Sequence, residues 1–359
     1  MTAVAVPDGS IELPGPFALE SGESLPSVTV AHRTWGRLDA KGDNAVLVCH
    51  ALTGSADVDR WWGALLGPGR SLDPDRDFVV CSNVLGGCYG TTGPTSPRPG
   101  GHGRWGGDFP AVTVRDIVRV QAALLDALGV KRLRLVVGGS LGGMQVLEWA
   151  LLFPDRVEAI APIAVSARHS AWAIGLSEAQ RQAVYADPRW RDGRYPEGDG
   201  PGAGLAVARQ IAMCTYRSRA SLEARFSRTE AEAGVFAVEG WLRHHGRALV
   251  DRFDASAYVA LTKAMDTHDV GRGRGGWREA LATVRVPALV VSIDTDVLYP
   301  PVEQEELADA LPLARLARLA SPHGHDAFLI EGETTNALVA RFRRDVESGK
   351  GREEGTWVA

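Results

Sequence analysis

One stretch constrains the fold of this chain more than any other: residues 135–145, which read L-V-V-G-G-S-L-G-G-M-Q. Its centre, residues 138–142, fits G-x-S-x-G, the pattern of a sharp strand-to-helix turn that exposes a serine. Such a turn holds its serine in a strained backbone conformation, and glycines two positions before and after relieve the crowding. We therefore predict that Ser140 is a nucleophile on this turn. The alternative is a plain Gly-Ser turn between buried elements.

The sequence on both sides of Ser140 has the pattern that this turn requires. Residues 132–137 form a β-branched apolar run typical of a buried strand, and apolar residues recur at helical spacing over 141–153. Other runs predict strands at 27–32, 44–50, 77–83, 157–165, 286–292 and 316–320, and helices at 113–128 and 303–311. This order of elements predicts an α/β fold with a mostly parallel central sheet and helices on both faces.

The strand pattern stops between about residues 168 and 285. This stretch is rich in Ala, Arg, Glu and Trp, and helical runs are expected at 177–185, 204–212, 229–236 and 257–265. A block of helices between two sheet strands indicates a helical cap inserted over the C-terminal edge of the sheet. We therefore expect a core of residues 1–167 and 286–359, with an inserted cap of residues 168–285.

Two later segments supply the groups that activate a serine. Asp294 and Asp296 follow the predicted strand 286–292, and His325 lies in the run S-P-H-G-H-D near the C-terminus. Serine, then an acid after a late strand, then a histidine is the chain order of an α/β-hydrolase catalytic triad. The residues alone do not choose between the two aspartates. H-G-H-D also suits a metal site, but no third ligand at metal spacing accompanies it, so no metal is expected.

A triad of this kind needs backbone N–H groups to hold the oxyanion. By chain order these are the N–H of Leu141, directly after the serine, and one from the loop after the strand 44–50, at Leu52 or Thr53. His50 precedes that loop, and we expect it to shape the loop rather than to act as a base. The Gly- and Pro-rich segment 85–107 follows another strand end, and we expect it to line the site.

Composition and charge exclude several classes of function. The net charge of −5, without a dense Lys/Arg cluster, argues against a nucleic-acid binder. No apolar run approaches the length of a membrane span, and residues 1–7 lack the basic and apolar regions of a signal peptide. The four cysteines form no C-x-x-C pair, which favours a reduced, cytoplasmic protein.

Several further motifs are more specific than the serine turn and the triad order. They are H-A-L-T-G (50–54), L-G-G-C (85–88) leading to G-P (93–94), G-G-S with G-G-M-Q (138–145), A-R-Q-I-A-M (208–213) with T-Y-R (215–217), R-F-D (252–254), D-T-H-D (266–269) and G-H-D-A-F (324–328). With these motifs the chain resembles the homoserine O-acetyltransferases of methionine biosynthesis, in the α/β-hydrolase superfamily. The resemblance runs from about Ala31 to Phe342. Leu141 replaces the Met that is usual in the family, which matters little because this residue acts through its N–H.

The resemblance assigns roles to individual residues. It implies that Ser140 is the nucleophile, His325 the base and Asp296 the acid. It also implies that Arg209 and Asp326 bind the substrate, and this pair suits an amino acid. A guanidinium grips an α-carboxylate, and a carboxylate holds an α-ammonium. Without the resemblance, Arg209 would be read as a surface residue. We expect the histidines at 169, 268 and 323 to be structural.

The resemblance also implies a reaction: ping-pong transfer of an acetyl group from acetyl-CoA to L-homoserine through acyl-Ser140. Acetyl-CoA would be a co-substrate, with no bound cofactor. The partners would be small molecules, with no nucleic acid and no membrane, and the protein would be a homodimer. The alternatives are a succinyl-CoA donor, a serine acceptor, a capped esterase, and a non-catalytic scaffold of the same fold.

Overall fold

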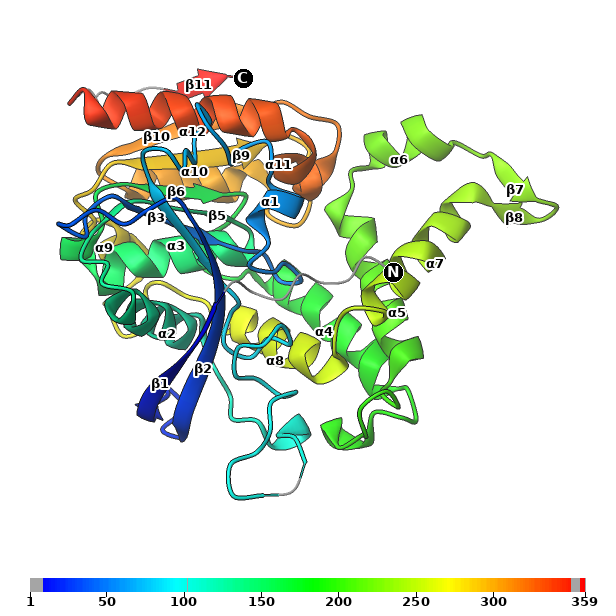
Figure 1. Cartoon of the computed structure of the whole chain (residues 1–359). Helices are drawn as coiled ribbons and strands as arrows, with labels where there is room; N and C mark the ends of the chain where they lie inside the picture. The colour runs from blue at the N-terminus through cyan, green and yellow to red at the C-terminus, as the bar shows by residue number, and fades with distance from the viewer. Residues whose placement is uncertain (1–8, 102, 350–355, 359) are drawn as a thin grey trace.

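The fold is built around one large twisted sheet (Figure 1). A computed structural model describes residues 9–101, 103–349 and 356–358; the segment 1–7, on which the expectation about a signal peptide rests, lies outside the described residues. The nine strands lie in the order β1-β2-β4-β3-β5-β6-β9-β10-β11. The pairs β1/β2 and β2/β4 are antiparallel, and the other neighbours are parallel. The predicted mostly parallel sheet is confirmed.

The strands follow the apolar runs of the sequence. They are β1 (Gly9–Ala18), β2 (Ser24–Trp35), β3 (Ala45–Cys49), β4 (Phe78–Ser82), β5 (Leu133–Gly139), β6 (Ile160–Ile163), β9 (Ala288–Ile293), β10 (Ala314–Leu319) and β11 (Thr356–Val358). Every strand expected from an apolar run overlaps one of these. β1 was not expected, because its Gly and Pro residues interrupt the pattern of alternation.

Helices cover both faces of the sheet, as predicted. Residues of β5 belong to two separate apolar clusters: Leu133 and Val136 to one, Leu135 and Val137 to the other. The pairing of β5 with β3 shifts register between Leu133 and Leu135, so the alternation is regular only from Leu135 on. The first cluster includes residues of α2 (Val114–Ala127), α3 (Leu141–Leu152) and α10 (Pro301–Ala310), and the second includes residues of α1 (Val58–Trp61) and α12 (Gly332–Glu347). The strands at the centre are therefore buried on both sides, which explains their continuous apolar runs.

Between β6 and β9 the chain leaves the main sheet. This part holds α4 (Ala171–Tyr185), α5 (Gly202–Tyr216), α6 (Arg219–Phe226), α7 (Ala237–Val250), α8 (Ala255–Asp266) and α9 (Trp277–Leu281). In Figure 1, α5, α6 and α7 stand to the right of the sheet. Short helical turns are η1 (Gly106–Asp108), η2 (Pro154–Arg156), η3 (Arg191–Gly193), η4 (Gly324–Asp326) and α11 (Ala327–Ile330). No helix in the described part of the chain is long and apolar enough to cross a membrane.

One expectation for this segment is wrong. Residues 229–236 were expected to be helical, but they form a hairpin of β7 (Glu230–Glu232) and β8 (Val235–Phe236). Gly234 turns the chain with a φ of +77°, a conformation that suits glycine and breaks a helix. The segment is too short for periodicity to separate a helix from a hairpin. The strand pattern therefore does not stop completely between residues 168 and 285.

Candidate active site

Ser140 lies on the turn between β5 and α3 with a φ of 58° and a ψ of −125°. Its N–H donates to the carbonyl of Ile163 at 3.0 Å, so the turn is fixed to the neighbouring strand. A Cβ on Gly138 or Gly142 would lie 2.5 Å or 2.1 Å from the carbonyl oxygen of Cys49. Backbone packs against backbone at both positions, which is why glycine stands on each side of this serine.

His325 and Asp296 form a buried pair at the same end of the sheet. Asp296 follows β9, and His325 lies in η4, after β10. The Nδ1 of His325 lies 2.6 Å from the Oδ2 of Asp296. The other oxygen of Asp296 accepts from the N–H groups of Leu298 and Tyr299, at 2.8 and 3.0 Å. Burial by itself lowers the pKa of His325, but the charge and hydrogen bond of Asp296 outweigh it, so the pKa is raised.

The other candidate acid, Asp294, has a different partner. Its Oδ1 accepts from the N–H of Ser321 at 3.0 Å, in the segment that leads into His325. The side chain of Thr295 also binds this segment, through the carbonyl of Ser321 at 2.6 Å. The structure therefore brings Asp296 to the histidine, and Asp294 to the backbone before it.

The ring of Phe328 packs against both His325 and the serine turn. A Cβ on Gly139, beside Ser140, would lie 2.6 Å from the ring of Phe328, and that ring is 5.8 Å from the His325 ring. The Nε2 of His325 is buried and has no hydrogen-bond partner among the described residues. It is the ring nitrogen that Asp296 leaves available, and a general base takes its proton there.

The loop that carries Leu52 is held by the side chain of His50. The Nδ1–H of His50 donates to the carbonyl of Ala51 at 2.8 Å, and its Nε2 accepts from the N–H of Val84 at 3.2 Å. Burial lowers the pKa of His50 to about 4, so the ring is neutral and both nitrogens are occupied. His50 thus shapes this loop, as we expected.

A buried amide joins this loop to the serine turn. The Nε2 of Gln145 donates to the carbonyls of His50, at 3.3 Å, and Leu141, at 3.0 Å. Gln145 accepts in turn from Gln121 at 2.8 Å, and both side chains are buried. Because one side chain binds both segments, the loop that carries Leu52 and the turn that carries Leu141 are fixed in position relative to each other.

Arg209 and Asp326 both lie near the histidine. The guanidinium of Arg209, on α5, lies 5.1 Å from the Tyr216 ring centre, and the Tyr216 and His325 rings are 5.7 Å apart. Burial raises the pKa of Asp326, although Arg209, His325 and Arg217 act against this rise. The Nε of Arg217 lies 3.9 Å from the Asp326 carboxylate.

Our sequence reasoning gave no role to Tyr216 or Tyr299, whose rings both lie against His325, Tyr299 at 5.4 Å. Tyr216 stands seven residues after Arg209, which is about two helical turns and therefore the same face of α5. That spacing was a usable signal. Tyr299 had none, because only the packing of the loop after β9 brings it to the histidine.

The three histidines that we expected to be structural, at 169, 268 and 323, contact other parts of the protein. The Nδ1 of His169 lies 3.1 Å from the hydroxyl of Tyr299, and His268 contacts the carbonyl of Ser166 at 3.2 Å. His323 lies 3.1 Å from the hydroxyl of Ser221. Among the described residues, no group of three or more His, Cys, Asp or Glu side chains is placed to hold a metal ion.

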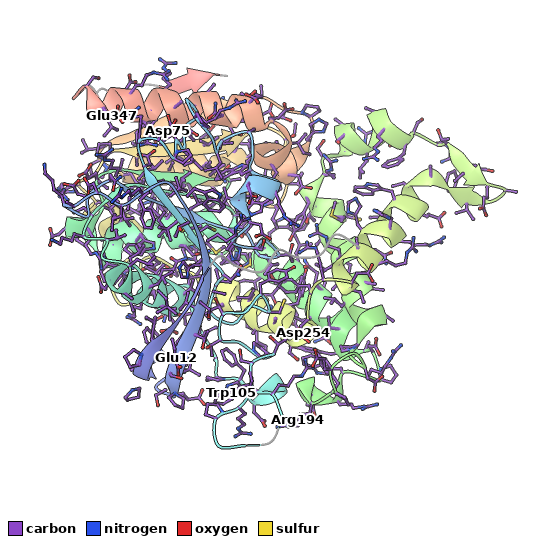
Figure 2. The ribbon with its side chains drawn as sticks, viewed as in Figure 1. Glu12, Asp75, Trp105, Arg194, Asp254 and Glu347 are labelled. Atoms are coloured by element: carbon purple, nitrogen blue, oxygen red, sulfur yellow. The ribbon has the colours of Figure 1, made fainter. Side chains whose placement is uncertain are left out.

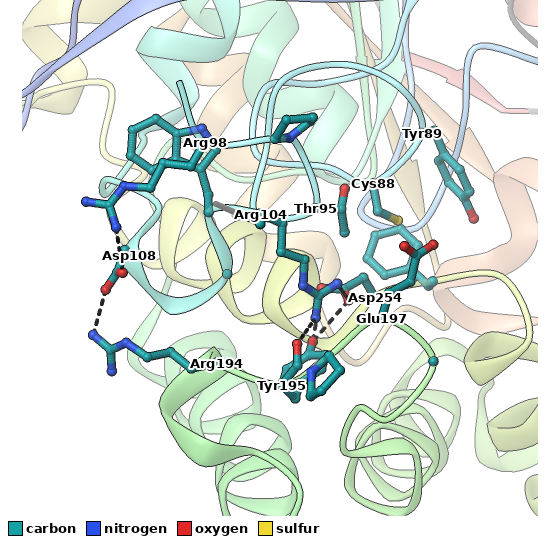
Figure 3. A pocket seen from close by; sticks show the side chains of 18 of the residues that line it. Cys88, Tyr89, Thr95, Arg98, Arg104, Asp108, Arg194, Tyr195, Glu197 and Asp254 are labelled. Carbon is teal, nitrogen blue, oxygen red and sulfur yellow. Dashed lines mark hydrogen bonds and ion pairs between the residues drawn. The ribbon is translucent and has the colours of Figure 1, made fainter. Parts of the chain in front are cut away.

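A large cavity of about 1230 Å³ adjoins the segment 85–107 (Figure 3). Its walls come from this segment and from residues 193–198 and 250–254. Arg98 and Arg194 share the carboxylate of Asp108 at one end, at 3.0 and 2.6 Å (Figure 3). Figure 2 shows Trp105, Arg194 and Asp254 gathered where these segments meet.

This cavity shares part of its wall with a small gap beside the Leu52 loop. Cys88, Tyr89 and Phe253 line the large cavity and also a small gap bordered by His50 and Leu52. Ser140 and His325 are not among the residues that line the large cavity. The segment 85–107 therefore lies beside the candidate oxyanion loop.

Comparison with known proteins identifies the family. Residues 44–332 match the family described as the alpha/beta hydrolase fold. A homoserine O-acetyltransferase from Trichormus variabilis is 59% identical over 335 residues, which cover 93% of each chain. The chain belongs to the homoserine O-acetyltransferase family. The family predicted from the sequence motifs is therefore confirmed.

The chain is similar in structure to a solved homoserine O-acetyltransferase and also to a solved esterase. A homoserine O-acetyltransferase from Staphylococcus aureus superposes with a TM-score of 0.77 at 27% identity, covering 93% of this chain and 94% of its own. Esterase E22 superposes with a TM-score of 0.85 at 25% identity, covering 93% and 99%. The α/β-hydrolase fold is thus shared by a transferase and an esterase, and the fold alone does not separate the two reactions.

Proposed function

We propose that this protein is a homoserine O-acetyltransferase, which moves the acetyl group of acetyl-CoA onto the hydroxyl of L-homoserine in methionine biosynthesis. The observation that carries the proposal is the position of Arg209 and Asp326. Arg209 packs on the ring of Tyr216, which in turn lies against the ring of the buried His325, and Asp326 directly follows His325 in the chain. The two charges suit an amino acid. An esterase needs a serine, a base and an oxyanion hole, but it has no use for an amino-acid clamp.

The first half-reaction forms an acyl-enzyme. The Oγ of Ser140 attacks the thioester carbon while the Nε2 of His325 takes the hydroxyl proton. Asp296 holds the Nδ1–H of the imidazole, at 2.6 Å, and stabilises the imidazolium that forms. The N–H groups of Leu52 and Leu141 bind the oxyanion. The C–S bond then breaks, and the leaving thiolate of CoA receives the proton from His325.

The second half-reaction transfers the acetyl group. Arg209 binds the α-carboxylate of homoserine and Asp326 its α-ammonium, which brings the side-chain hydroxyl to the acyl-serine. His325 takes the proton of that hydroxyl as its oxygen attacks. The intermediate collapses to O-acetyl-L-homoserine, and the proton returns to Ser140. Water competes with homoserine at this step, so the residues over the site must restrict water.

The proposal also covers the domain division, the cofactor, the oligomeric state and the compartment. Residues 168–285 act as a cap over the core of residues 1–167 and 286–359. Acetyl-CoA is a co-substrate, and the reaction itself uses neither a bound cofactor nor a metal. We also propose a homodimer in the cytoplasm, in line with the family resemblance and with four cysteines that form no disulfide.

The test is to offer the purified protein acetyl-CoA or succinyl-CoA together with L-homoserine or L-serine. Thiol release is followed while the mass of the product is measured. We expect release that depends on homoserine and a product heavier by one acetyl group. Thiol release at the same rate without an acceptor would indicate an esterase. A succinylated product or an acylated serine would reassign the donor or the acceptor.

A further inference from the structure

Arg252 joins the segment between α7 and α8 to two loops of the core. Its Nη1 donates to the carbonyl oxygen of Thr53 at 2.7 Å and to the hydroxyl oxygen of Tyr89 at 2.6 Å. Its Nη2 lies 3.4 Å from the Oγ1 of Thr53. Within the described part of the chain, Arg252 forms no ion pair with a carboxylate. The guanidinium therefore acts as a fork between neutral oxygens.

The position of these contacts matters because Leu52 precedes Thr53. The carbonyl of Ala51 is held from one side by His50 and by the N–H of Gly54, at 2.8 and 2.9 Å. In a trans peptide the C=O and N–H point in opposite directions, so these bonds set the direction of the Leu52 N–H. Two residues after Ala51, the carbonyl of Thr53 accepts from Arg252. Leu52 thus lies between two anchored peptide groups, one anchored by the core and one by the segment 168–285.

The contact of Arg252 is supported at both ends. The ring of Phe253, the next residue, packs edge-on against Tyr89 with 5.6 Å between centres. The carbonyl of Tyr89 accepts from the side chain of Asn83 at 2.7 Å. Asn83 also accepts from the N–H of Ala56, just beyond the Leu52 loop, at 2.7 Å. The loop, the segment 85–107 and the residues around 252 therefore hold one another in place.

We propose that Arg252 is a positioning residue for the oxyanion hole. It fixes the exit of the loop at Thr53 so that the N–H of Leu52 stays aimed at the oxyanion, and it makes this aim depend on how residues 168–285 sit on the core. The proposal rests on the proposed function only for the use of the Leu52 N–H as an oxyanion donor.

The test compares Arg252→Ala and Arg252→Lys with a matched control, Arg243→Ala. Arg243 is an exposed arginine on α7 that pairs with Glu239 at 2.8 Å. Each variant is assayed with acetyl-CoA and with 4-nitrophenyl acetate, an acyl donor that has no CoA. Because losing an oxyanion donor costs ~10²–10³ in kcat, we expect a misaimed donor to cost roughly 10- to 50-fold. The loss should be of the same size with both donors and leave KM nearly unchanged.

Three results would overturn the proposal. A loss seen with acetyl-CoA alone, as a higher KM, would make Arg252 a contact for CoA. Full activity in Arg252→Lys would mean that only its charge matters, because lysine cannot donate to Thr53 and Tyr89 as a fork. A loss of kcat in Arg252→Ala no larger than that in Arg243→Ala would mean that Arg252 does not position the oxyanion hole. The ester assay needs no homoserine, so it tests Arg252 even where the wild-type protein fails to acetylate homoserine.

A second variant covers the case in which Arg252→Ala does not fold, as judged by thermal unfolding. Tyr89→Phe removes one acceptor of the Arg252 fork and leaves the ring that packs against Phe253. We expect its kcat to fall by about 2- to 5-fold with both donors, because one donor of the hole becomes less well aimed. Unchanged turnover with both donors would contradict the proposal.

Discussion

Ser140 stands where the backbone leaves no room for a side chain two residues to either side, whereas the exposed faces of the helices between β6 and β9 include positions with open space. A Cβ on Gly142 would lie 2.1 Å from a backbone oxygen, but one on Gly240, in α7, would meet nothing within 4 Å. The proposed nucleophile, acid and base, Ser140, Asp296 and His325, all come from segments that follow strand ends. Arg209 comes from the surface of a helix. The contrast suggests that the sheet carries the chemistry and that the helices over it choose the acceptor.

The largest loss of activity should follow a change in the turn between β5 and α3. In Ser140→Ala the attacking oxygen is absent, so we expect thiol release from acetyl-CoA to fall by roughly 10⁴-fold or more. The assay is thiol release with and without homoserine. Ser10→Ala, an exposed serine of β1, should keep normal turnover. Turnover that survives in Ser140→Ala would show that the chemistry does not depend on this turn.

Asp296→Asn should follow, with a loss of about 10³- to 10⁴-fold in kcat. One oxygen of Asp296 accepts two backbone N–H groups, so an asparagine would keep its oxygen there and turn its NH₂ toward His325. The imidazole would then adopt the wrong tautomer, with its proton on Nε2. Asp294→Asn is the matched control, because its acceptor for Ser321 remains, and it should change kcat by less than about threefold.

The pH profile of the same variant sharpens the result. His325 must be neutral to take a proton, so the wild-type rate falls as the pH drops through its pKa, which Asp296 raises. Without the negative charge this pKa is lower. The acidic limb of kcat/KM in Asp296→Asn should therefore shift to lower pH. An unchanged limb would mean that Asp296 does not set the pKa of the essential base.

A change on the helix side should affect only the acceptor. In Arg209→Ala the α-carboxylate of homoserine loses a charge-assisted partner, so we expect kcat/KM for homoserine to fall by about 10²-fold. The first release of thiol from acetyl-CoA should stay within about threefold of wild type. Arg219→Ala, at the start of α6, is the control. An equal loss of rate in both half-reactions would contradict the idea that the sheet carries the chemistry and the helices choose the acceptor.

The smallest effect concerns stability. Gly240→Ala places a better helix former at an exposed position with open space, so we expect the free energy of unfolding to rise by about 0.5–1 kcal/mol. Thermal unfolding should detect a small increase in Tm. Gly142→Ala is the contrasting change, and its collision with the carbonyl of Cys49 should lower Tm sharply. A similar response at both positions would contradict the difference in packing described above.

Much of the sheet and of the site was open to prediction from local pattern. The apolar runs marked the strands, since residues buried on both faces of a parallel sheet leave no alternation. The helical expectation for residues 229–236 failed, because eight residues around one glycine do not distinguish a helix from a hairpin. Arg209 and Asp326 were suggested only by the family resemblance, because neither has a local pattern that marks a binding residue.

The sequence by itself determined the serine turn. Glycines at fixed distances from Ser140 between a strand and a helix allow one conformation, and that is a local property of the chain. The residues by themselves left Asp294 and Asp296 open, and only the family resemblance favoured Asp296. The tertiary structure shows that Asp296 meets His325, and it alone decided which rings surround the histidine and that Arg252 reaches Thr53 from nearly 200 positions away. These contacts join residues far apart in the chain, and they form only when the sheet and the helices over it pack together.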